Sequence, residues 1–192
     1  MKHNLRITLI LLEMFIATQI IGIYVVNFYS PVKIIDGKQQ NVSAPELPYG
    51  MQPPELKENR EFNEVFVSII IAFVIAISLI FLLSKFNAAF ILKLWFFIVI
   101  VIALGITFSS FIPSFKYSLL IILVVSLLLS FFKIYKTNFY IHNITELFVY
   151  PGIAAVFVPL LNLYTIIALL IVISIYDIWA VWHSGIMQKM AK

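Results

Sequence analysis

The stretch Ile171-Val172-Ile173-Ser174-Ile175-Tyr176-Asp177-Ile178-Trp179-Ala180-Val181 places one acidic side chain inside the last long apolar run of the chain. A run of roughly 18 or more apolar residues predicts a helix that crosses a membrane. A carboxylate at that depth is costly to keep in hydrocarbon, and ionisable residues within spans usually face a bundle interior or a water-filled cavity. The stretch therefore predicts a transmembrane helix and makes Asp177 the first candidate for a functional residue.

The composition of the whole chain is that of a polytopic membrane protein. Of its 192 residues, 62% are hydrophobic and 11% are charged, whereas soluble domains are about half apolar and about a quarter charged. The apolar runs are continuous rather than alternating, which excludes a transmembrane β-barrel. No cysteine is present, so disulfides, thiolate metal sites and thiol nucleophiles are excluded. The sequence predicts an all-α polytopic membrane protein.

Six apolar runs predict six transmembrane helices within a single transmembrane domain, residues 1–192. The first run is too long for the apolar region of a typical signal peptide, so we expect it to be retained as a span. The connections after the second span are short, which predicts that consecutive spans pack as antiparallel hairpins. The predicted spans lie near residues 7–28, 63–84, 88–109, 116–132, 140–160 and 163–183.

The only long hydrophilic segment, residues 30–61, lies between the first two spans. Because proline disrupts both helices and sheets, we expect this segment to form an extended or partly mobile loop outside the membrane. Its five prolines are Pro31, Pro45, Pro48, Pro53 and Pro54.

The distribution of basic residues predicts that both termini are cytoplasmic. With the N-terminus inside, eight lysines and arginines lie on the cytoplasmic side and five outside, and four of those five fall in the long loop, where positive charge constrains topology less. The formal net charge is only +4, and its lysines lie at span ends, so the charge suits topology control rather than binding of nucleic acid.

Three acidic residues fall within predicted spans: Glu13, Glu146 and Asp177. Glu13 and Glu146 are close enough to an interface for hydration or for pairing with a lysine, which favours structural roles. Glu146 and Asp177 lie about equally far from the turn near residues 161–162. An antiparallel hairpin of the last two spans would therefore place them at similar depth.

The helical face around Asp177 is small and polar. Helical spacing places Ser174, Ala180 and, further along, Ser184 on the same side as Asp177, which leaves room for water, substrate or a close neighbouring helix. A packing face with a hydrogen-bonded, structural Asp177 is the alternative. The three histidines, His3, His142 and His183, do not gather with the acids in the sequence, so we expect neither a metal site nor a cofactor.

The pair Tyr176-Asp177, deep in a sixth span that ends near the cytoplasm, resembles the first catalytic motif of the presenilin and signal peptide peptidase family of intramembrane aspartyl proteases. The flanking residues 171–181 are similar to the presenilin branch and its microbial homologues, and Gly152-Ile153-Ala154-Ala155-Val156-Phe157 in the fifth span is similar in character. The resemblance implies that Asp177 is a catalytic aspartate, that Tyr176 supports it, and that the chain corresponds to the N-terminal part of a nine-helix fold.

Members of this family carry a second catalytic aspartate in a Gly-x-Gly-Asp motif on the seventh span and a Pro-Ala-Leu motif on the ninth. Neither motif occurs in the sequence, which ends at Lys192. Aspartyl proteolysis needs two carboxylates, one acting as a base toward water and one as an acid. We therefore expect this chain to be inactive by itself.

The resemblance implies three kinds of partner: membrane lipids, transmembrane peptide or protein substrates, and a C-terminal half, from the same gene product or a separate chain, that carries the second aspartate. Two other functions remain open. The chain could be a proton- or cation-coupled transporter that uses Glu13, Glu146 and Asp177 as a layer of carboxylates, or a non-catalytic membrane scaffold.

Overall fold

The computed structural model describes residues 5–35, 38–42, 45–51, 59–86, 89–113, 115–136 and 138–182, and it consists mainly of helices. Helices α1 to α5 each carry an apolar stretch long enough to cross a membrane, and the apolar stretch described in α6 is Leu163–Ile178. The prediction of an all-α polytopic membrane protein is confirmed. The helices are α1 Leu5–Tyr29, α2 Asn59–Lys85, α3 Ala89–Phe111, α4 Ser118–Tyr135, α5 Phe139–Phe157 and α6 Leu163–Trp182.

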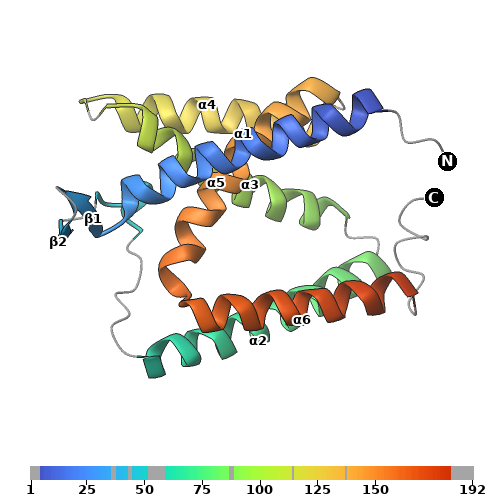
Figure 1. The fold of residues 1–192 in the computed structure, drawn as a ribbon. Coiled ribbons are helices and arrows are strands. Elements are labelled where there is room, and N and C mark those ends of the chain that lie inside the picture. The colour runs from blue at the N-terminus through green and yellow to red at the C-terminus, as the bar shows by residue number, and fades with distance from the viewer. Residues whose placement is uncertain are drawn as a thin grey trace.

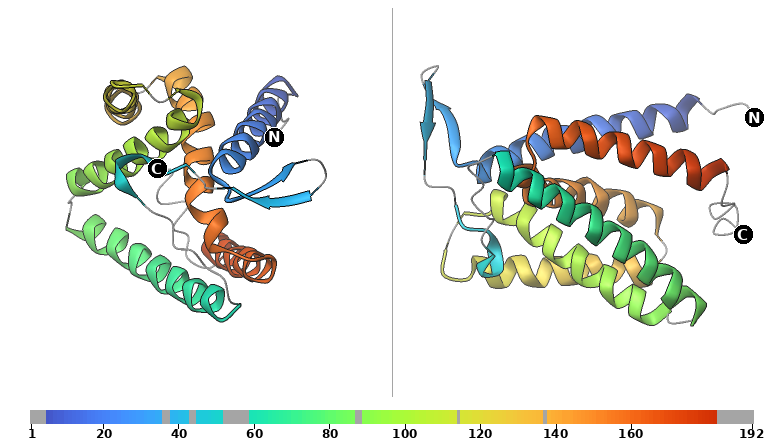
Figure 2. Two further views of the ribbon diagram at one scale, coloured as in Figure 1. Left: turned by 90° about the vertical axis from the view of Figure 1, so that its left-hand side faces the viewer. Right: turned by 90° about the horizontal axis from the view of Figure 1, so that it is seen from below.

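The helices form two groups. Helices α1, α3, α4 and α5 pack against one another and are called here the four-helix group, while α2 and α6 run side by side in the same direction and are called the outer pair (Figure 1). The two further views show the same division, with α2 and α6 together at one side of the molecule (Figure 2). Both hydrophobic core clusters among the described residues lie in the four-helix group and the loop that covers it.

The closest approach in the four-helix group is between α3 and α5. A Cβ atom on Gly152 would overlap the backbone carbonyl of Ala103, so only glycine permits this separation. The hydroxyl of Thr107 donates a hydrogen bond of 2.6 Å to the carbonyl oxygen of Phe148. That carbonyl precedes Pro151, which lies inside α5 and disturbs the helical hydrogen-bond ladder there.

Tyrosines attach α1 to α3. The hydroxyl of Tyr29 donates to the carbonyl oxygen of Ile106 over 2.9 Å, and that of Tyr24 donates to Ser110 over 3.2 Å. The ring of Tyr24 also stacks on that of Phe111, with 4.8 Å between centroids. Because lipid tails are as apolar as leucine, such polar and close-packing contacts are what distinguish one helix neighbour from another in a membrane.

Asparagine side chains define where the last two helices begin. The Oδ1 atom of Asn138 accepts the backbone N–H of Tyr140 over 2.9 Å at the start of α5. At the start of α6, Asn162 and Thr165 bond reciprocally: each backbone N–H donates to the other's side-chain oxygen over 2.9 Å. Both arrangements satisfy N–H groups that the first helical turn leaves without a partner.

The loop between the first two helices differs from the prediction. Two short strands, β1 Val32–Ile35 and β2 Lys38–Asn41, pair in antiparallel register, with Val32 opposite Asn41. The expectation that proline would keep this segment free of sheet is wrong here, because Pro31 and Pro45 flank the strands and neither strand contains proline. Further along, the 3₁₀ turn Pro48–Gly50 lies on the four-helix group and Leu47 is buried in its core.

The expectation that consecutive helices pack as hairpins is wrong for α5 and α6. After the 3₁₀ turn Val158–Leu160, α6 leaves α5 and runs along α2 (Figure 1). The short connection does not determine the angle between the two helices. The bend in α5 and the second proline, Pro159, change the direction of the chain between them. We expected Glu146 and Asp177 to lie at similar depth in an antiparallel hairpin, but their helices do not form one.

Candidate functional site

Asp177 lies in the last third of α6, on the outer pair. Its side chain is exposed, and within the described residues it forms no hydrogen bond or ion pair. A structural carboxylate inside an apolar helix is expected to be paired, since an unpaired charge in hydrocarbon is costly. Among the described residues, no bond gives Asp177 a structural role.

Tyr176 is half-buried and connects the two helices of the outer pair. Its ring meets that of Phe73 in α2 edge-on, with 5.7 Å between centroids and 82° between planes. Edge-to-face pairs of this kind are worth about 0.5–1.5 kcal/mol beyond the area that they bury. The contact places Tyr176 on the side of α6 that faces α2, and Asp177 is the next residue of the helix. Sequence reasoning did not find Phe73, which is one of several phenylalanines in apolar runs.

The small polar face expected around Asp177 is only partly within the described structure. The hydroxyl of Ser174 donates to the carbonyl oxygen of Leu170 over 2.7 Å, so it is satisfied within its own helix. The side chain of Ala180 and the whole of Ser184 lie outside the described residues. What remains is one carboxylate on an exposed helical face with a hydroxyl one turn away.

Glu146 forms part of a charged cluster between α4 and α5. Its Oε1 atom lies 3.3 Å from Nζ of Lys133 and 3.0 Å from Nε2 of His142. The expectation that Glu146 pairs with a lysine is confirmed. Glu146 is therefore engaged in a contact between helices, and no hydrogen bond or ion pair joins it to Asp177.

The acids predicted within spans are not gathered into one layer of contacts. Glu13 is exposed on α1, Glu146 is paired on α5, and Asp177 is on α6. The described residues include no group of three His, Asp or Glu side chains that could hold a metal ion. His3 and His183 lie outside the described residues. The arrangement gives the transporter alternative no specific support.

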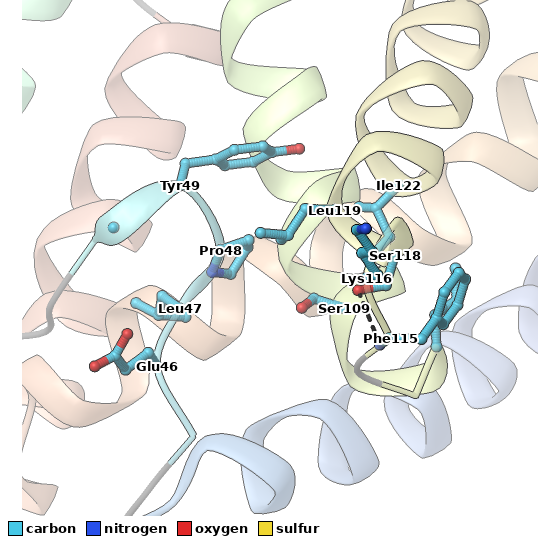
Figure 3. Close-up of a pocket in the computed structure, with 12 residues that line it drawn as sticks. Glu46, Leu47, Pro48, Tyr49, Ser109, Phe115, Lys116, Ser118, Leu119 and Ile122 are labelled. Carbon is cyan, nitrogen blue, oxygen red and sulfur yellow. Dashed lines mark hydrogen bonds between the residues drawn. The ribbon is translucent and has the colours of Figure 1, made fainter.

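A cavity of about 530 Å³ lies at the other end of the molecule from Asp177. It is an open cavity bordered by the loop around Pro48–Gly50, the end of α3 and the start of α4 (Figure 3). Tyr49 has a left-handed backbone conformation, with φ of 66°, and its ring packs on Gly105 of α3. Burial raises the pKa of the Tyr49 hydroxyl above its ordinary value. The turn signal Pro48-Tyr49-Gly50 was visible in the sequence, but the surface that it covers was not.

These helices, with the carboxylate of Asp177 unpaired among the described residues, define a polytopic α-helical membrane protein with a candidate acid–base residue. A family model described as signal-peptide peptidase, presenilin aspartyl protease matches residues 42–192, which is most of the chain and includes Tyr176-Asp177. No curated protein and no solved structure matches the chain. The chain belongs to the signal-peptide peptidase, presenilin aspartyl protease family.

Proposed function

We propose that this chain supplies Asp177 as one of the two catalytic carboxylates of an intramembrane aspartyl protease, with Tyr176 as a positioning residue. The observation that carries the proposal is the coincidence of two facts at one position. The family match extends across α6, and Asp177 has no bond within the described structure that would give it a structural role.

The chemistry requires a second carboxylate close to Asp177. In an aspartyl protease the two groups share one proton: the ionised one takes a proton from the attacking water, and the protonated one donates to the carbonyl oxygen of the scissile bond. Their apparent pKa values then belong to the pair. Glu146 does not fill this position, because Lys133 and His142 hold its Oε1 atom.

The second aspartate therefore comes from a segment outside this sequence, either in the same gene product or in a separate chain. The sequence contains no Gly-x-Gly-Asp motif, so we expect no hydrolysis by this chain alone. Its substrates are peptide bonds of membrane-spanning proteins or peptides. With both termini cytoplasmic, Asp177 lies in the cytoplasmic half of the membrane, and cleavage takes place there.

The experiment is to produce the chain together with a family segment that carries Gly-x-Gly-Asp, in the same membrane, and to measure cleavage of a transmembrane reporter peptide. Asp177→Asn removes the proton-exchanging group while keeping the size of the side chain. We expect cleavage to fall by at least about 100-fold, the scale attributed to one acid–base group.

Glu13→Gln is the matched control, because Glu13 is also an intramembrane acid and is exposed on α1. We expect it to cleave at the normal rate. Normal cleavage by Asp177→Asn would overturn the proposal. If both variants lost proton or cation flux to the same extent and neither affected cleavage, the transporter function would take its place.

A further inference from the structure

The cavity at the start of α4 contains one cation and one anion that do not neutralise each other. Lys116 and Glu46 both line it, both are exposed, and no ion pair joins either of them to another described residue. Lys116 is instead held over the ring of Tyr117, 5.7 Å from its centroid. Two opposite charges that line the same cavity without pairing each provide a contact for a ligand that carries both charges.

The rest of the lining is amphipathic. Leu119 and Ile122 of α4 form an apolar wall, and the hydroxyl of Ser118 lies at its edge, where it accepts the backbone N–H of Phe115 over 3.4 Å (Figure 3). The first turn of α4 has no acidic residue and no side-chain cap, so its N–H groups add partial positive charge beside Lys116. This side of the cavity suits a phosphate.

The position of the cavity indicates the source of the ligand. It lies where the apolar stretch Phe90–Phe111 ends and Ser118–Tyr135 begins, which is the level at which lipid head groups meet the helices. The exposed side chain of Tyr117 is of the aromatic type enriched at that level. The volume of about 530 Å³ is within the range of about 300–1,000 Å³ that small-molecule sites occupy.

We propose that this cavity binds the head group of a phospholipid with a primary ammonium, such as phosphatidylethanolamine. The phosphate lies against Lys116 and the start of α4, the ammonium lies toward Glu46, and the acyl chains leave along the exposed side chain of Leu119. Asp177 takes no part, so this inference does not rest on the proposed protease function.

The test measures lipid retention by the purified chain with native mass spectrometry, after exchange into detergent with equal amounts of phosphatidylethanolamine, phosphatidylcholine and phosphatidylglycerol. We expect the native chain to retain phosphatidylethanolamine best. Lys116→Gln should weaken retention of all three lipids about tenfold, the effect of losing one charged contact of about 1.4 kcal/mol. Glu46→Gln should reduce only phosphatidylethanolamine, to the level of phosphatidylcholine.

Three further measurements test whether the lipid is retained at this cavity. Lys38→Gln removes an exposed charge from strand β2, away from the cavity lining, and should retain lipid as the native chain does. Leu119→Trp should fill the cavity and lower retention with both charges present. Soluble phosphoethanolamine in excess should fail to displace the lipid; displacement would assign the site to a free head group. Equal retention by Lys116→Gln, Glu46→Gln and Lys38→Gln would show only non-specific association and overturn the proposal.

Discussion

The four-helix group and the outer pair are built by different rules. In the four-helix group, glycine and threonine allow backbones to approach closely, as at Gly152 and Thr107, and tyrosine hydroxyls bond across helices. In the outer pair, no described side chain of α2 is buried, and in α6 only Thr165 is. Among the described residues, the rings of Phe73 in α2 and Tyr176 in α6 form an edge-on pair between these helices.

The comparison shows that the candidate catalytic residue lies on the part of the molecule with the fewest packing contacts. Segments with few buried contacts open at low free-energy cost, and functional elements are commonly drawn from them. A helix pair with so few buried side chains can receive a further helix or a substrate without first breaking a core. The four-helix group then acts as the rigid support.

The largest effect on stability should come from Gly152→Ala. The added Cβ overlaps the backbone of Ala103, which has to shift. We therefore expect a loss of about 1–3 kcal/mol in the free energy of unfolding, measured by denaturant titration of the protein in mixed micelles. Gly22→Ala in α1 is the matched control, since nothing lies within 4 Å of its Cβ. That variant should gain up to about 1 kcal/mol from helix propensity. Equal effects at the two glycines would contradict the close-packed description of α3 and α5.

The next effect concerns the cluster at Glu146. Lys133→Met should cost about 1 kcal/mol, because the side chains of Lys133 and Glu146 are only 11% and 29% exposed and the carboxylate loses its charged partner. For comparison, the ion pair of Arg60 and Glu64 in α2 is 85% and 67% exposed. Arg60→Met should therefore leave the midpoint of denaturation unchanged. A larger loss of stability from Arg60→Met than from Lys133→Met would contradict the conclusion that the four-helix group is the more tightly packed of the two groups.

A smaller effect is expected at the hydrogen bond between α3 and α5. Thr107→Val removes the donor to the Phe148 carbonyl and keeps the shape, at a cost of about 0.6 kcal/mol, the average for such bonds in membranes. Thr18→Val is the control, because its hydroxyl donates to Met14 within its own helix α1. A neutral Thr107→Val would mean that glycine packing alone joins the two helices.

A modest effect on stability and a clear effect on activity should come from Phe73→Ala. It removes the ring against which Tyr176 packs, at a cost of about 0.5–1.5 kcal/mol, while we expect cleavage in the completed protease to fall because Asp177 loses its orientation. Phe73→Tyr, which keeps the ring, should restore cleavage. Reduced stability in Phe73→Ala without any change in the cleavage rate would limit Tyr176 to a packing role.

The sequence allowed the helices to be predicted more fully than their arrangement. Continuous apolar runs specify where helices form, since backbone groups in lipid must bond within the segment, and the lysine partner of Glu146 followed from the cost of an unpaired acid. The separation of α6 from α5 did not follow, because a short connection and Pro159 permit several directions. The cavity between Glu46 and Lys116 depends on how Tyr49 packs on Gly105, a contact between residues far apart in the chain.

The measurement that tests the central claim most directly is a paired one on Asp177→Asn: cleavage by the completed protease and the free energy of unfolding of the same preparation. A carboxylate kept for catalysis and not for packing should, when replaced, abolish cleavage and leave stability unchanged or higher. Cleavage at the normal rate, or a loss of cleavage that is matched by a loss of stability of several kcal/mol, would contradict the account.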